Sequence, residues 1–300
     1  GINCEWVPHP LRTIVLVTGV FVSFGVAGVV QEFLLKRKHY PHSIMLTIAQ
    51  PVVTAALGLL FGGFSTRKAS LQSHAAVGVL ASATVGLSNL SLLFLNYPVQ
   101  IVAKSSKPVP VMIVGALLYG RTHSRKEYLS ALVLMVGLST FVLADKAASP
   151  DFNAFGLLII GGALVADAFI GNVQQKVMAE GSSKMEVLCY GNLFATAISL
   201  APLAMEDVPL VVADTVGDSS IVAGLVLLGV ANFVGLTFVL TLISTVGAAQ
   251  TVFYTSLRKA ATLALSFVLF PKPWVWNHVL GASIVGFGIY VNHVAKQQKK

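Results

Sequence analysis

The sequence has 300 residues, of which 55% are hydrophobic and only 11% charged, and its mean hydropathy is +0.80. Soluble domains carry about 25% charged residues, so the composition excludes an ordinary soluble domain and a disordered chain, and it predicts a membrane protein. The formal net charge of +8 reflects a scarcity of acidic residues and not a dense basic tract, which argues against nucleic acid as a partner.

Apolar stretches long enough to cross a bilayer as a helix, roughly 20 residues each, follow one another along the chain. The first apolar run, at 13–30, precedes further spans, so we expect a first membrane helix and not a cleaved leader. We therefore predict an all-α integral membrane protein of about ten transmembrane helices. The expected spans are residues 12–34, 43–64, 72–95, 98–119, 127–145, 154–174, 186–204, 220–243, 247–270 and 274–294.

The distribution of Lys and Arg outside these spans predicts the orientation. If both termini are cytosolic, most of these cations fall on the cytosolic side, although the basic run Lys36–Lys38 falls on the opposite side. The acidic segment at 205–219 is then expected to be a lumenal loop.

Four cations fall inside predicted spans: Lys104 and Lys107 in the fourth, and Arg258 and Lys259 in the ninth. A Lys or Arg at the centre of a span costs at least about 2.5–3.5 kcal/mol, so such residues are expected to face a protein interior or a water-filled cavity. Snorkelling to the interface suits one residue near a helix end better than four. Arg258 offers a planar fork for phosphate or sulfate oxygens, and Lys259 a mobile point charge. A multiply charged anion would complete such a cavity.

The local sequence adds geometry to the two lysines. Lys104 and Lys107 are three residues apart, which places them on one helical face. Pro108 and Pro110 follow at once, and proline interrupts the hydrogen bonds of a helix. We expect a kinked span with freed carbonyls beside the lysines, as in the broken helices that carry transporter sites.

Five further residues are candidates for the same site. Glu32, an acid inside a span, can pair with a lysine until substrate displaces it, or it is an interface residue. Asp167 and Asn172, in the sixth span, either hydrogen-bond a nucleoside or tie helices together. Tyr97 and Tyr254 flank the cationic segments; they either stack on a base or are ordinary interfacial or core tyrosines.

An internal repeat appears when the chain is shifted by 151 residues. The coincident pairs are Lys107 with Arg258, Arg121 with Lys272, and Gly137 with Gly288. We predict a single membrane domain at 1–300 made of two five-helix repeats, 12–145 and 154–294. Five is odd, so the repeats would have inverted topology, with the site where they meet.

Other classes of protein are less consistent with the sequence. Cys4 and Cys189 are expected to be two separate free thiols, because neither has a His or Cys partner at metal-ligand spacing. We therefore expect no metal and no cofactor, and the absence of a grouped nucleophile and base argues against an enzyme. A channel would show pore-lining rings and a selectivity element, whereas paired cations beside prolines fit a carrier.

Several segments resemble nucleotide-sugar transporters of the drug/metabolite transporter superfamily, over about residues 85–295. These segments are LSNLS at 87–91, NYPVQ at 96–100, KSSKPVPVM at 104–112, ADAFIGNVQQK at 166–176, RKA at 258–260 and FPKP at 270–273. The chain departs from the family pattern at Pro108 and at 255–257. The most similar branch carries 3′-phosphoadenosine 5′-phosphosulfate (PAPS), and a near sister group carries UDP-galactose or UDP-glucose.

The resemblance implies an antiporter that works by alternating access. It implies that PAPS, or alternatively a UDP-sugar, enters the lumen in exchange for a nucleoside phosphate. It also implies that the lysines of the fourth span and the Arg-Lys pair of the ninth hold phosphate groups. The implied location is the Golgi membrane, with the endoplasmic reticulum as the alternative. Membrane lipid is an expected partner, and a homodimer is left open.

Overall fold

The structure is a computed structural model. It describes residues 9–34, 38, 40–64, 68–91, 94–95, 100, 103–104, 106–143, 153–269 and 276–297. Within these ranges the side chains at 9–10, 32, 43, 142, 259–269, 293 and 296–297 lie outside the description.

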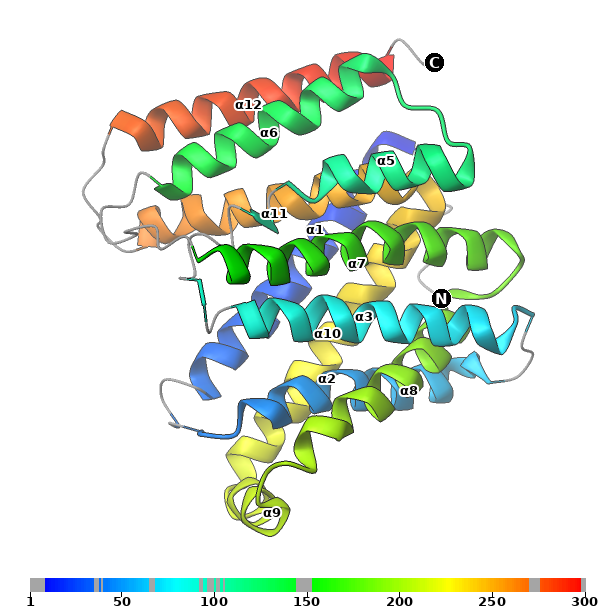
Figure 1. Cartoon of the computed structure of the whole chain (residues 1–300), viewed down its shortest axis with the longest axis vertical. Coiled ribbons are helices and arrows are strands. Elements are labelled where there is room, and N and C mark those ends of the chain that lie inside the picture. The colour runs from blue at the N-terminus through cyan, green and yellow to red at the C-terminus, as the bar shows by residue number, and fades with distance from the viewer. Residues whose placement is uncertain are drawn as a thin grey trace. The chain divides into compact units, whose positions relative to one another are not determined.

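The described residues form helices and include no strand, which confirms the all-α prediction (Figure 1). The helices are α1 (His9–Glu32), α2 (Ser43–Gly58) with the π-helical η2 (Leu59–Gly63), α3 (Leu71–Ser91), α5 (Pro108–Tyr119), α6 (Arg125–Leu143), α7 (Ala154–Ala179), α8 (Lys184–Leu203), α9 (Val208–Val216), α10 (Ser219–Val246), α11 (Ala248–Leu269) and α12 (Trp276–Gln297).

Five stretches of the described chain are long and apolar enough to cross a membrane. They are Leu11–Gln31, Ile44–Gly63, Ala154–Ala179, Lys184–Leu203 and Ser219–Val246. This agrees with an integral membrane protein, while the count of ten spans stays a prediction.

The prediction of a loop at 205–219 is wrong in one respect, because this segment contains the helix α9. Asp207 caps this helix by accepting a hydrogen bond from the Leu210 amide, and a proline occupies its first turn. Both features are ordinary start signals of a helix. The sequence prediction missed the helix because nine residues are too few to form a span.

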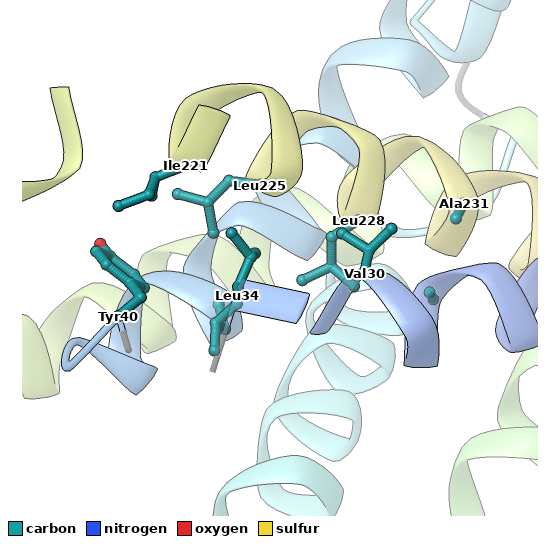
Figure 2. Packing of buried hydrophobic residues seen from close by; sticks show 9 residues of the cluster. Val30, Leu34, Tyr40, Ile221, Leu225, Leu228 and Ala231 are labelled. Carbon is teal, nitrogen blue, oxygen red and sulfur yellow. The ribbon is translucent and has the colours of Figure 1, made fainter. Parts of the chain in front are cut away.

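The contacts divide the chain into two compact units, and each unit takes residues from both halves of the sequence. The first unit comprises 1–82 and 173–247. In it α1 packs on α10, and α2 packs on α8 and α10. Figure 2 shows Val30 and Leu34 facing Leu225 and Leu228 in a buried cluster. A Cβ added at Gly224 of α10 would lie 2.8 Å from Leu34 Cδ2, so the glycine allows Leu34 to pack closely on α10 without a shift of its side chain.

The second unit comprises 83–172 and 248–300. In it α6 and α12 lie side by side (Figure 1). A Cβ added at Gly137 would lie 2.7 Å from the Val285 nitrogen, and one at Gly288 would lie 3.1 Å from the Leu134 nitrogen. The two helices are therefore antiparallel. The 151-residue offset relates Gly137 to Gly288 and also Leu134 to Val285. A two-fold relation between two helices gives such reciprocal contacts, although the repeat of five helices stays a prediction.

Candidate functional site

Lys104 and Lys107 lie where a helix is interrupted, just before α5. Residues 103–104 are helical, 106–107 form a turn, and α5 begins at Pro108 with Lys107 as its N-cap. Proline suits this first position, because a backbone N–H there would have no acceptor within the helix and because the φ of proline is already helical. The Ser106 amide and hydroxyl both donate to the Ala103 carbonyl, at 3.1 and 2.7 Å.

This geometry confirms the expected break but corrects its form. Pro108 starts a helix and does not kink a continuous one, and α5 has only 12 residues, about 18 Å of helix. The expectation of freed carbonyls is wrong at two positions. The Ala103 carbonyl accepts from Ser106, and the Lys107 carbonyl accepts from the Val111 amide at 3.3 Å.

Both lysines converge on one carboxylate, that of Asp167 near the middle of α7. Lys107 Nζ lies 2.7 Å from Asp167 Oδ1, and Lys104 Nζ lies 3.6 Å from Oδ2. The Asp167 side chain is 3% exposed, whereas those of Lys104 and Lys107 are 19% and 26% exposed. These three groups together carry one net positive charge, and only the cations are accessible.

This pairing was not predicted, because the sequence analysis gave the role of displaceable partner to Glu32 and expected Asp167 to hydrogen-bond a nucleoside or tie helices together. Asp167 lies 60 residues from Lys107 in sequence. The available signal was general: an acid inside a span needs a cation nearby, and Lys104 and Lys107 were two of the four cations predicted inside spans.

Asn172 ties α7 to α5, one of the two roles predicted for it. Its Nδ2 donates to the Val111 carbonyl of α5 at 3.0 Å and to the Ala168 carbonyl of α7 at 2.8 Å. A Cβ added at Gly115 would lie 3.0 Å from Asn172 Oδ1, so the helices approach closely here. The buried amide thereby fixes the start of α5, and with it Lys107, against the helix that carries Asp167.

The ninth expected span is α11, which packs on α5 within the same unit. Arg258 is half-buried on α11. Tyr254 packs against the cluster of Leu134, Leu138, Phe253 and Val285, with its ring centroid 6.3 Å from that of Phe253. This agrees with the core tyrosine alternative, and stacking on a base stays a prediction.

Three predicted site residues have no described side chain. Lys259 lies on α11 and Glu32 ends α1, but both side chains fall outside the described part. Tyr97 lies outside the described residues altogether. Their roles stay predictions. Among the described residues no group of three or more His, Cys, Asp or Glu could hold a metal ion.

A second buried acid–base pair lies in the first unit and was not predicted. His74 Nε2 lies 3.0 Å from Glu186 Oε1. The same oxygen accepts from the Lys68 amide at 3.0 Å, the Ala69 amide at 3.3 Å and the Ser182 hydroxyl at 3.0 Å. The pair joins the first turns of α3 and α8.

Comparison with known proteins identifies the family. Residues 12–296 match the UAA transporter family. The chain is 34% identical to UDP-galactose/UDP-glucose transporter 4 of Arabidopsis thaliana, over 98% of this chain and 86% of the relative. It is 34% identical to adenosine 3′-phospho 5′-phosphosulfate transporter 2 of Aedes aegypti, over 94% and 76% of the two chains. The Mus musculus transporter of that name is 31% identical, over 100% and 83%.

A protein of known crystal structure has a similar fold, with a TM-score of 0.72 and 14% sequence identity over 98% of this chain and 100% of the other. The family and the named relatives are transporters and not enzymes. The chain therefore belongs to the UAA transporter family, as its resemblance to nucleotide-sugar transporters predicted.

Proposed function

We propose that this protein is a membrane antiporter that carries PAPS from the cytosol into the Golgi lumen and returns a nucleoside phosphate. The observation that carries the proposal is the convergence of two partly exposed lysines, Lys104 and Lys107, on the buried Asp167. Relatives named as adenosine 3′-phospho 5′-phosphosulfate transporters, at 31–34% identity, support the choice of substrate.

The lysines suit an anhydride of phosphate and sulfate for a simple electrostatic reason. Hydrogen bonds between an ammonium and phosphate oxygens are charge-assisted and roughly twice as strong as neutral ones. The bridging carboxylate of Asp167 shows that the two ammonium groups can share one anionic group. Phosphosulfate oxygens would take the place of the carboxylate oxygens on Lys104 and Lys107.

Arg258 and Lys259 are the proposed contacts for a second anionic group, the 3′-phosphate. Arg258 lies on α11, which packs on α5, and its planar fork matches phosphate oxygens. Tyr97 and Tyr254 are the proposed stacking partners of the adenine, and Glu32 is a further proposed contact. Asp167 and Asn172 would act by holding the cationic residues in place.

A UDP-galactose or UDP-glucose carrier is the second candidate. It is favoured by the 34% identity to the Arabidopsis thaliana transporter, which covers 98% of this chain. The charge of the ligand separates the two candidates. A UDP-sugar carries one diphosphate, whereas PAPS adds a 3′-phosphate, which would engage the Arg-Lys pair of α11.

The test is exchange in reconstituted vesicles at fixed salt, with PAPS, UDP-galactose, UDP-glucose and ATP outside and a nucleoside phosphate inside. We expect preferential uptake of PAPS that is stimulated by the internal nucleotide, whereas a channel would be indifferent to it. Uptake should be lost in Lys107→Ala and Arg258→Ala but kept in Lys176→Ala, which removes an exposed cation outside the site.

Preferential uptake of a UDP-sugar would contradict PAPS as the substrate and would still agree with the exchange mechanism. Undiminished transport by both site variants would contradict the site. Localisation of the tagged protein to the endoplasmic reticulum would replace the Golgi assignment, and protease protection of terminal tags would test the cytosolic orientation of both ends.

A further inference from the structure

We infer that Asp167 is a built-in competitor of the anionic substrate, a role that rests on the proposed function. When no substrate is bound, the carboxylate occupies the ammonium groups that the substrate would take. It thereby limits how tightly the substrate is held and speeds its release. Asp167 is a positioning residue in this role, because it acts through Lys104 and Lys107.

The exposure of the three side chains indicates which groups an incoming anion meets. The carboxylate is almost completely buried on α7, while both lysines are partly exposed. An anion can therefore reach the ammonium groups without first reaching Asp167. Lysine is a mobile point charge on a flexible four-carbon stem, so each ammonium group can move from the carboxylate to a ligand while α7 stays in place.

Charge balance explains why such competition would serve a carrier. An uncompensated buried charge is strongly unfavourable, so the empty site needs an internal anion and the loaded site does not. A carrier that bound its substrate very tightly would release it slowly, because differences in affinity are mostly differences in dissociation rate. Asp167 lowers the affinity by stabilising the empty site.

The test compares Asp167→Asn, which keeps the shape and removes the charge, with Asp167→Glu, which keeps the charge. Dissociation constants for PAPS and for inorganic pyrophosphate come from ligand-induced thermal shifts, and rates come from exchange in vesicles. We expect Asp167→Asn to bind both anions at least 10-fold more tightly and to show a lower maximal exchange rate. Asp167→Glu should remain close to the wild type.

Equal or weaker anion binding by folded Asp167→Asn would overturn the inference. If Asp167→Asn does not fold, Lys104→Met and Lys104→Met/Asp167→Asn are compared instead. The double variant keeps one ammonium group, that of Lys107, and the same net charge as the wild-type group. The double variant should bind pyrophosphate at least 10-fold more tightly than the single one, and equal affinity would contradict the inference. Failure of the wild type to bind any nucleotide, with pyrophosphate binding still strengthened, would contradict only the proposed function.

A separate observation concerns α9, for which we infer a position in the membrane interface with one face against lipid. The helix has nine residues, about 13.5 Å of length, and cannot cross a hydrocarbon core of about 30 Å. It connects α8 and α10, both apolar and long enough to span. It must therefore lie near one surface of the membrane.

The side chains of α9 divide sharply between protein and surroundings. Val211 and Thr215 are buried, and the Tyr40 and Thr215 hydroxyls lie 2.5 Å apart. Asp214, at the edge of the exposed face, lies 2.9 Å from His42 Nε2. The remaining exposed side chains from 208 to 216 are all apolar: Val208, Pro209, Leu210, Val212, Ala213 and Val216.

This apolar face fits lipid because α9 connects two helices, α8 and α10, that are themselves apolar and long enough to span. Of its two polar side chains, Thr215 is buried and Asp214 pairs with His42 at the edge, so the rest of the exposed face is apolar. A helix that lies in the interface buries its apolar face at the boundary of headgroups and acyl chains. Contiguous apolar surface of this kind is otherwise unfavourable on a water-exposed helix.

The test attaches an environment-sensitive fluorophore to Val212→Cys or Val216→Cys, in a chain that also carries Cys4→Ala and Cys189→Ala. Glu180→Cys, at an exposed residue after α7, serves as the control. In phosphatidylcholine vesicles with brominated acyl chains we expect at least two-fold quenching at 212 and 216 and little at 180. Equal, water-like emission at all three positions would overturn the inference. A water-excluded emission at 212 and 216 that appears only at a high protein-to-lipid ratio would indicate that a second copy of the chain covers α9, and it would also contradict the inference.

Discussion

Asp167 in α7 and Glu186 in α8 are both buried carboxylates that pair with basic side chains, but their partners differ in kind. Glu186 accepts from a fully buried His74, two backbone amides and a hydroxyl. Asp167 pairs with two lysines on flexible stems that remain 19% and 26% exposed. The backbone donors of Glu186 are fixed by the chain, whereas the partners of Asp167 are ammonium groups on flexible side chains.

The two pairs therefore differ in the accessibility of the cation and not in the burial of the acid, since both carboxylates are 3% exposed. Glu186 also belongs to a helix cap, because its amide donates to Ser183 Oγ at 3.0 Å at the start of α8. Its network therefore closes locally around the ends of two helices. The Asp167 group carries a net positive charge and stays open to an anion.

The largest expected effect on stability comes from breaking the closed pair. Glu186→Leu removes the acceptor of His74 and of the Lys68 and Ala69 amides. Breaking a buried pair by removing one partner costs roughly 3–5 kcal/mol. Thermal unfolding in detergent should show a markedly lower Tm. Added substrate should not raise the Tm of this variant more than it raises that of the wild type. An unchanged Tm would make the pair dispensable.

The next largest effect is expected on transport and not on folding. Lys107→Ala removes the closer of the two ammonium groups from Asp167. A hydrogen bond to a charged group contributes about 1.5–3 kcal/mol, which corresponds to roughly 10–100-fold in transport efficiency. Initial rates in vesicles measure this effect, with the amount of folded protein determined by size-exclusion chromatography. An initial transport rate in Lys107→Ala equal to that of the wild type would contradict the proposal that the Asp167 pair, unlike the Glu186 pair, takes part in transport.

A smaller effect is expected from the amide that holds the open site in position. Asn172→Ala leaves the Val111 carbonyl without its donor from α7. The expected loss is about 1–2 kcal/mol in stability, with a modest decrease in anion affinity because Lys107 is no longer held against α7. Thermal shifts with and without pyrophosphate separate the two effects. Affinity that falls as far as in Lys107→Ala would instead indicate direct contact between Asn172 and the ligand.

The smallest effect is expected at an exposed pair, which sets the baseline for the comparison. Lys176, in the last turn of α7, and Glu180, just after it, lie 3.8 Å apart with side chains 59% and 42% exposed. Exposed i,i+4 pairs contribute about 0.3–0.5 kcal/mol. Lys176→Ala should therefore change neither the Tm nor the exchange rate measurably. A large loss of transport in this variant would show that charge in general, and not the site, controls uptake.

Much of the fold follows from local sequence. Helices form where apolar runs of about 20 residues lie, because a backbone in lipid must satisfy its own hydrogen bonds. Pro108 and Pro110 likewise marked the interruption beside Lys107, since proline acts on its own turn. α9 was missed because its cap and proline are short-range signals that were overshadowed by the search for long apolar runs.

The sequence by itself determined that this is a helical membrane protein of the UAA transporter family with more cations than acids in its apolar segments. Those features depend on composition, spacing and similarity along the chain. Only the tertiary structure decided that Asp167 is the shared partner of Lys104 and Lys107, and that Asn172 ties their segment to α7. These residues are about 60 positions apart, and helical periodicity relates only near neighbours, so packing of α5 against α7 had to bring them together.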